Sequence, residues 1–119
     1  MPGFVYDVAS YFNIPVSPDK NSKYNPWNTL KNIARKEDFV AVKLDIDSPK
    51  VEWKLIEQLF EDVELQGLID EFFFEHHVLE NPAVPLGWHM SPGMDQTTAQ
   101  SYKVFLKLRE KGIRAHAWV

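Results

Sequence analysis

The sequence predicts a single α/β domain with a small, mainly parallel sheet and flanking helices. Three short apolar runs, within residues 39–44, 68–78 and 113–119, have the length and composition of strands. They alternate along the chain with segments that show the apolar spacing of amphipathic helices. Strands that alternate with helices indicate βαβ units, in which neighbouring strands are parallel and the crossovers are right-handed.

The length of the chain sets the number of domains. A sequence of 119 residues that is 45% hydrophobic is sufficient for one domain with a modest core. Residues 1–24 form the least regular part, although Phe4-Val5-Tyr6 has the composition of a short strand. We expect residues 25–119 to form the α/β core. No apolar run approaches the roughly 20 residues that span a bilayer, so we expect no membrane span.

The first helix is predicted to begin at Asn25 and Pro26, because asparagine favours the N-cap and proline the first helical position. A single apolar stripe follows, formed by Trp27, Leu30, Ile33 and Ala34. We expect this helix to end near residues 37–38.

The strand predicted over Phe39–Leu44 is apolar except for Lys43. A short, nearly continuous apolar run is typical of a strand buried on both faces, so we expect it to be the central strand of the sheet. Ser48 and Pro49 after it have the pattern of an N-cap and a first helical residue. The second helix then carries apolar residues at helical spacing: Val51, Leu55, Ile56, Leu59, Phe60 and Val63.

Gly67 is expected to separate this helix from the second strand, within residues 68–78. We expect Phe72-Phe73-Phe74 to contribute to the core on both faces of the sheet. Three prolines and two glycines in residues 81–93 predict a long loop. A third helix is predicted to start at Asp95 and to bury Ala99, Tyr102, Phe105, Leu106 and Leu108, and Gly112 to end it before the last strand.

Four side chains at strand ends are the candidate site residues. Asp45 and Asp47 follow the first strand at a spacing that places both on one side of an extended chain, and Glu75 and His77 repeat this spacing after the second. If the strands are parallel neighbours, these groups meet at the ligand-binding edge of the sheet. They are candidate ligands for Mg²⁺ or Ca²⁺ and candidate catalytic acid–base residues. The alternative, which the sequence alone favours, is solvated strand ends that cap the next helix and pair with Lys43 or Arg114.

The charge and the cysteine content exclude several classes of function. The net charge is −4 and the basic residues are scattered, so we expect no nucleic-acid partner. The chain has no cysteine, which excludes disulfides and thiolate zinc sites and favours an intracellular location. The N-terminus also lacks the pattern of a signal peptide. A three-stranded sheet has two edges, and we expect residues 1–12 or a second copy of the chain to cover one of them.

The strand–acid–helix segment at residues 38–47, with Glu52 and the Phe-Phe-Phe-Glu-His-His run at 72–77, resembles the second half of FkbM-type methyltransferases. That family is similar in having an apolar strand that ends Lys-x-Asp-Ile-Glu-Gly, a helix, and a strand that ends near Glu-x-His. Residues 108–118 also resemble the family's last helix and strand. Asp47 and Ser48 stand where the family has Glu-Gly.

The resemblance implies a partial Rossmann-like methyltransferase fold and S-adenosylmethionine as cofactor. Class I methyltransferases hold that cofactor with a glycine-rich turn, and no such turn is formed by the five glycines of this chain: Gly3, Gly67, Gly87, Gly93 and Gly112. Methyl transfer by this chain alone is therefore left open. Two functions remain: a methyltransferase-like domain that binds a small molecule or a metal at the acidic strand ends, and a non-enzymatic module that pairs with itself or a partner through a sheet edge.

Overall fold

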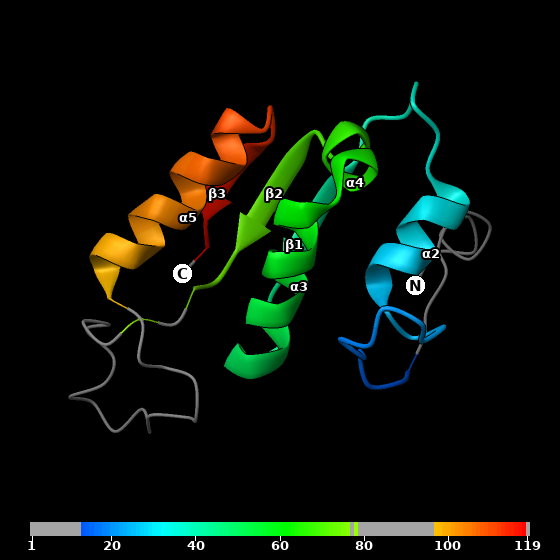
Figure 1. Ribbon diagram of the computed structural model, residues 1–119, viewed down its shortest axis with the longest axis horizontal. Coiled ribbons are helices and arrows are strands. Elements are labelled where there is room, and N and C mark those ends of the chain that lie inside the picture. Colours follow the sequence, from blue (N-terminus) through cyan, green and yellow to red (C-terminus); the bar gives the residue numbers. More distant parts are fainter. Residues whose placement is uncertain (1–12, 77, 79–96, 119) are drawn as a thin grey trace, which may run out of the picture.

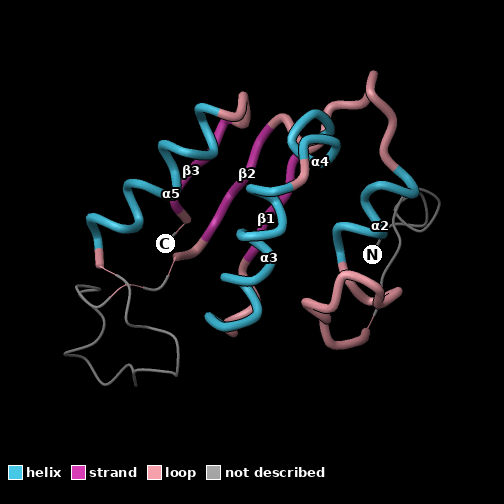
Figure 2. The backbone as a smooth tube through the Cα atoms, viewed as in Figure 1, coloured by secondary structure: helices cyan, strands magenta, loops and turns pink. Residues whose placement is uncertain are grey.

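The computed structural model describes residues 13–76, 78 and 97–118, in which helices and strands alternate as predicted (Figures 1 and 2). In chain order the elements are α2 (Pro26–Ile33), β1 (Ala41–Leu44), α3 (Pro49–Glu61), α4 (Val63–Leu68), β2 (Glu71–Phe74), α5 (Thr98–Glu110) and β3 (Arg114–Ala117). The predicted α/β class is confirmed. No helix among these residues is both long and apolar enough to cross a bilayer.

The sheet has the strand order β1-β2-β3, and both pairs of neighbours are parallel. Leu44 pairs with Phe74, and Phe74 pairs in turn with Ala117. Among the described strands, β2 lies in the middle and β1 at an edge, so the expectation that the first strand is central is wrong for this part of the chain. The sequence of β1 alone does not reveal how many strands flank it.

The helices cover one face of this sheet. Figure 1 shows α5 and α3 in front of the strands, with α2 at the side of β1. Two right-handed crossovers in the same direction place both connecting helices on the same face, which agrees with this arrangement. The core lies between the layers and includes Trp27, Leu55, Ile56, Leu59, Phe72, Phe74, Val104, Phe105 and Leu108.

The other face of the sheet is more open than the sequence predicted. In β1, Leu44 is buried, but Ala41 and Lys43 are exposed, so burial on both faces is wrong for this strand. Phe73 is half-buried on this face and stacks on His116, with ring centroids 4.8 Å apart. We refer to this side of the sheet as the open face. Phe39 precedes β1 and is 64% exposed.

The predicted helix starts are largely confirmed. Asn25 is the N-cap of α2, and its side chain accepts a hydrogen bond from the Trp27 N–H. Ser48 is the N-cap of α3, although its side chain makes no capping hydrogen bond. The N-cap of α5 is Thr97, which forms a capping box with Gln100. The cap was predicted two residues earlier, at Asp95, which lies outside the described residues, as does the loop over 81–93.

The second predicted helix is divided in two at Asp62. This residue has an extended backbone, with φ −110° and ψ 98°, and its side chain caps α4 by accepting a hydrogen bond from the Leu65 N–H. The helix direction changes here, which explains why Val63 is 79% exposed instead of buried as predicted. Gly67 lies inside α4 and does not end it.

The apolar stripes of α2 and α5 differ from prediction at several positions. Ile33, the last residue of α2, is 71% exposed. In α5 the buried residues are Val104, Phe105 and Leu108, whereas Ala99, Tyr102 and Leu106 are exposed. These last three form a second apolar stripe at i, i+3 and i+7 on the opposite side of the helix. The periodicity of α5 therefore allowed two buried sides, and the packing selects one.

Candidate functional site

Three of the four predicted site residues meet where β1 and β2 end. Asp45 and Glu75 directly follow the paired residues Leu44 and Phe74, and the Glu75 N–H donates to the Leu44 carbonyl at 3.3 Å. One carboxylate oxygen each of Asp45, Asp47 and Glu75 lies within 4.8 Å of the others. We call these three residues the carboxylate corner. The fourth predicted residue, His77, lies outside the described residues.

Asp47 reaches this corner through a turn and not through the extended chain that its spacing predicted. Its φ of 53° lies in the left-handed region, where aspartate is one of the few non-glycine residues that is tolerated. The chain then enters α3 at once, with Ser48 as N-cap. The turn changes the direction of the chain and still leaves the Asp47 carboxylate beside that of Asp45.

A fourth carboxylate, Glu52, supports the turn from inside the protein. It is only 1% exposed, and its Oε1 accepts a hydrogen bond of 2.9 Å from the Ile46 N–H, between the two aspartates. No role of its own was predicted for Glu52, because an acidic residue in the first turn of a helix is ordinary. Its burial depends on packing that no local pattern reveals.

Burial and neighbouring acids change the titration of Glu75. Burial, the hydrogen bond with the Asp45 side chain and the charges of Asp45, Asp47 and Glu52 raise the pKa of Glu75 to about 7. Like charges in one small site cannot all ionise easily, so the corner retains a proton near neutral pH. A carboxyl group that titrates near 7 can donate or accept a proton at physiological pH.

Lys43 is a cationic neighbour of the corner. Its Nζ lies 2.7 Å from an Asp45 carboxylate oxygen and 4.3 Å from the centroid of the Trp118 ring. The predicted pairing with Lys43 is therefore present. Arg114 lies on the open face instead, where its Nε is 3.7 Å from Glu71.

Aromatic rings stack around His76, the residue that follows Glu75. The ring of His76 stacks on Phe74 and on Trp53, with centroid distances of 5.2 Å and 5.9 Å. Trp53 lies in the first turns of α3, one position after Glu52.

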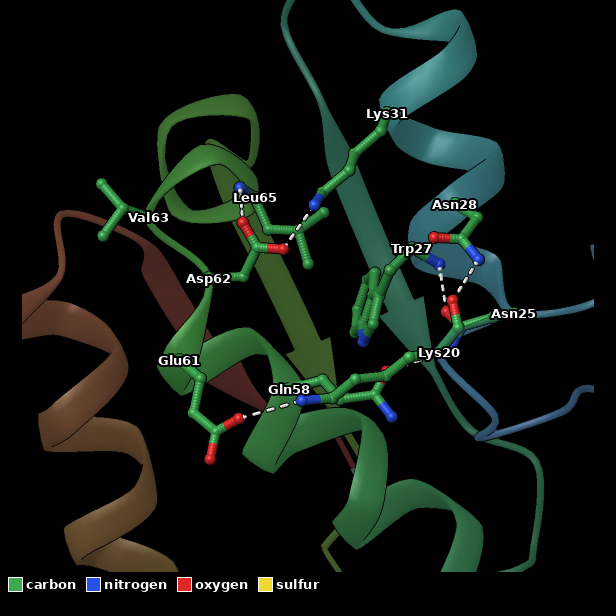
Figure 3. Close-up of a pocket in the computed structure, with 10 residues that line it drawn as sticks. All are labelled: Lys20, Asn25, Trp27, Asn28, Lys31, Gln58, Glu61, Asp62, Val63 and Leu65. Carbon is green, nitrogen blue, oxygen red and sulfur yellow. Dashed lines mark hydrogen bonds and ion pairs between the residues drawn. The ribbon is translucent and has the colours of Figure 1, made fainter. Parts of the chain in front are cut away.

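A separate cavity of about 400 Å³ lies between α2 and the junction of α3 with α4 (Figure 3). Its polar side chains satisfy one another: Asn25 donates to Gln58 at 2.9 Å, and Lys31 pairs with Asp62. The hydrogen bond to Asp62 raises the pKa of Lys31, and although burial opposes it, the same bond lowers the pKa of Asp62. This cavity is best explained as a polar contact between helices, and it shares no residue with the carboxylate corner.

The fold and the site together define an α/β protein with a parallel sheet and a group of acids at its strand ends. Among the described residues, the three side chains of the carboxylate corner have oxygen atoms close enough together to hold a metal ion. No protein-family model, no curated protein and no solved structure matches this chain.

Proposed function

We propose that this chain is a methyltransferase-like α/β domain in which the carboxylate corner faces a ligand. The observation that carries this proposal is the convergence of Asp45, Asp47 and Glu75 within 4.8 Å at the carboxyl ends of parallel strands. In open parallel sheets, ligands bind outside this edge. The resemblance of roughly residues 37–119 to the second half of FkbM-type methyltransferases supports the same assignment.

The ligand that suits this corner carries positive charge. Carboxylate oxygens from separate segments of the chain are the donors that Mg²⁺ and Ca²⁺ prefer. The same carboxylates would also attract the cationic part of a small molecule, such as a sulfonium or an ammonium group. Lys43 already lies 2.7 Å from Asp45, so the corner is a place where a cation is stabilised.

Proton transfer accompanies binding in this proposal. Because the pKa of Glu75 is about 7, the corner holds a proton that a bound cation would displace. Binding is then expected to strengthen as the pH rises through 7. In the absence of a cation, the protonated Glu75 beside the Asp45 carboxylate is equipped to act as a general acid.

The test is an isothermal titration of the full chain with Mg²⁺, Ca²⁺ and S-adenosylmethionine, each at pH 6 and pH 8. The site variant is Asp47→Asn, since asparagine also tolerates the left-handed backbone and should preserve the turn. The matched control is Glu57→Gln, which removes one exposed carboxylate from α3.

We expect at least one ligand to bind more tightly at pH 8 than at pH 6, and Asp47→Asn to weaken it about tenfold while Glu57→Gln leaves it unchanged. Heat of binding that is absent for every ligand would refute the proposal. An equal loss of binding affinity in the two variants would show that the net charge of the protein, and not the carboxylate corner, attracts the cation.

A second candidate function is self-association without catalysis, and the open face favours it. Phe39 and Trp118 are 64% and 45% exposed, and they lie with Phe73 on the side of the sheet away from α3 and α5. Exposed aromatic residues on one face are typical of interfaces between proteins. Sedimentation equilibrium at several concentrations tests for a second copy on this face. A mass that stays monomeric throughout would exclude this candidate.

A further inference from the structure

The outer edge of β1 carries an apolar cavity of about 670 Å³ that the proposed function does not use. We call it the edge slot. It lies between β1, α2 and the segment before α2, and its lining includes Ile14, Tyr24, Leu30, Ile33, Ala41 and Val42. Three of these side chains are large, apolar and well exposed: Ile33 at 71%, Tyr24 at 42% and Ile14 at 41%.

The edge slot has the position of a missing strand. α3 connects β1 to β2, α5 connects β2 to β3, and in Figure 1 each of these helices lies in front of strands that it joins. α2 precedes β1 in the same way, but it lies beyond the edge of the sheet, with no described strand behind it. A right-handed βαβ unit with α2 as its helix and β1 as its second strand would place its first strand next to β1, under α2.

α2 belongs to the same layer as the other helices, which supports this geometry. The Trp27 ring packs against Phe72 of the central strand at a centroid distance of 6.4 Å, and its indole N–H donates to the Leu55 carbonyl of α3 at 2.9 Å. The contacts of Trp27 therefore hold α2 in the same layer as the other helices. Leu30 and Ile33 extend from it over the space beside Ala41 and Val42.

We propose that the edge slot binds an extended segment, and that this segment is Phe4-Val5-Tyr6 of the same chain, added as a fourth parallel strand beside β1. These residues lie outside the described ranges, and their sequence is apolar, aromatic and β-branched, which suits a strand. They precede α2, as the unit requires. The chain from Tyr6 to Ile14 can span up to about 26 Å. A four-residue strand is only about 13 Å long, so this connection can reach from the end of the added strand to the segment before α2.

A segment without helices fits the edge slot better than a second copy of the chain does. Two copies that paired antiparallel through β1 in one continuous sheet would each bring α2 to the same face at the shared edge, where the two helices would compete for one space. A single strand needs only the space below α2. Its addition would also cover a sheet edge that is otherwise available for aggregation.

The test uses the absence of cysteine in the natural chain, because two introduced cysteines are then the only thiols. Val5→Cys and, separately, Tyr6→Cys are combined with Ala41→Cys on β1. The matched control replaces Ala41→Cys with Ala117→Cys, an exposed alanine on β3 at the opposite edge. Oxidation under mild conditions is followed by non-reducing electrophoresis, and circular dichroism checks the fold of every variant.

We expect one of the Ala41 pairs to form an intramolecular disulfide at least about tenfold faster than the matching Ala117 pair, since paired strands bring Cα atoms to within about 5–6 Å. Rates equal to those of the control would overturn the proposal. Disulfide-linked dimers through Ala41→Cys would overturn it in favour of a second copy at this edge. Neither result depends on whether the carboxylate corner binds a ligand.

Discussion

Single residues determine the chemistry of the carboxylate corner. Asp47 adopts a left-handed backbone that few residues tolerate, and this turn places its carboxylate beside Asp45. Buried Glu52 holds the Ile46 N–H in the middle of the turn. Glu75 arrives from the neighbouring strand, and its pKa of about 7 follows from burial and from the acids that surround it.

The first prediction concerns the pH dependence of stability. The pKa of Glu75 is about 7 in the folded protein, above its ordinary 4.5, so the folded state binds more protons between these values. The contribution of Glu75 to the free energy of unfolding therefore falls as the pH rises through this window. We expect Glu75→Gln to stabilise the protein at pH 8 by about 1–2 kcal/mol and to have little effect at pH 4.5.

Urea denaturation of both proteins at pH 4.5 and 8 measures this difference, with Glu57→Gln as the control. Wild-type and Glu75→Gln curves that differ by the same amount at both pH values would contradict the assigned pKa of Glu75.

The second prediction concerns Glu52. Glu52→Ala leaves the Ile46 N–H without its acceptor and opens space beside the turn, so we expect a loss of about 1–3 kcal/mol in the free energy of unfolding. Glu57→Ala, on the exposed side of α3, should cost less than about 0.5 kcal/mol. Chemical denaturation compares them. Equal, small losses would mean that Glu52 does not support the turn.

The candidate site was partly predictable at this scale. Asp45, Asp47 and Glu75 could be found because each directly follows an apolar run, and parallel pairing then brings strand ends together. Glu52 could not, because its burial depends on how α3 packs. The left-handed turn at Asp47 was also hidden, since the spacing of the two aspartates does not distinguish an extended segment from a turn that aspartate tolerates.

At the scale of elements, α2 is attached to the domain by polar contacts as well as by Trp27. The buried Asn25 side chain caps the helix at Trp27 and donates to Gln58 of α3 at 2.9 Å. Gln58 in turn donates to the Pro18 carbonyl. One side chain thus connects the helix start, the preceding segment and the next helix.

The third prediction follows from this role. Asn25→Ala removes the cap and leaves buried partners unsatisfied, so we expect a loss of about 2–3 kcal/mol in the free energy of unfolding. Asn32→Ala, an exposed position near the end of α2, is the matched control and should change stability by less than about 0.5 kcal/mol. Thermal unfolding of both variants measures the difference; similar melting temperatures would show that Asn25 has only a local effect.

Helix starts were the most predictable features of the elements, because Asn25-Pro26 and Ser48-Pro49 are local sequence patterns only two residues long. The break at Asp62 was not predictable from apolar spacing, which continues across it to Val63. In α5, two apolar stripes compete, and only the position of the sheet decides between them.

At the scale of the whole molecule, the described helices cover one face of the sheet. The alternation of strands and helices predicted parallel pairing correctly, because hydrophobic periodicity is a local signal. The central position expected for β1 was wrong, since strand order depends on the rest of the sheet. Coverage of both faces was wrong too, since described helices lie against only one of them.

The fourth prediction tests this one-sided packing with two adjacent phenylalanines. Phe72 is fully buried under the helices, whereas Phe73 is half-buried on the open face. We expect Phe72→Leu to lower the free energy of unfolding by about 1–2 kcal/mol and Phe73→Leu by less than about 0.5 kcal/mol. Denaturant unfolding compares them, and equal costs would indicate that the open face is as well packed as the other.

The most direct test of the carboxylate corner as a ligand-facing site is a ¹³C NMR titration of the Glu75 side-chain carboxyl, with and without Ca²⁺. The convergence of the acids predicts that the ¹³C chemical shift of this carboxyl has its inflection near pH 7 in the free protein. We expect Ca²⁺ to move the inflection to lower pH. An inflection near the ordinary 4.5 that Ca²⁺ does not move would contradict both the proximity of these carboxylates and their proposed role.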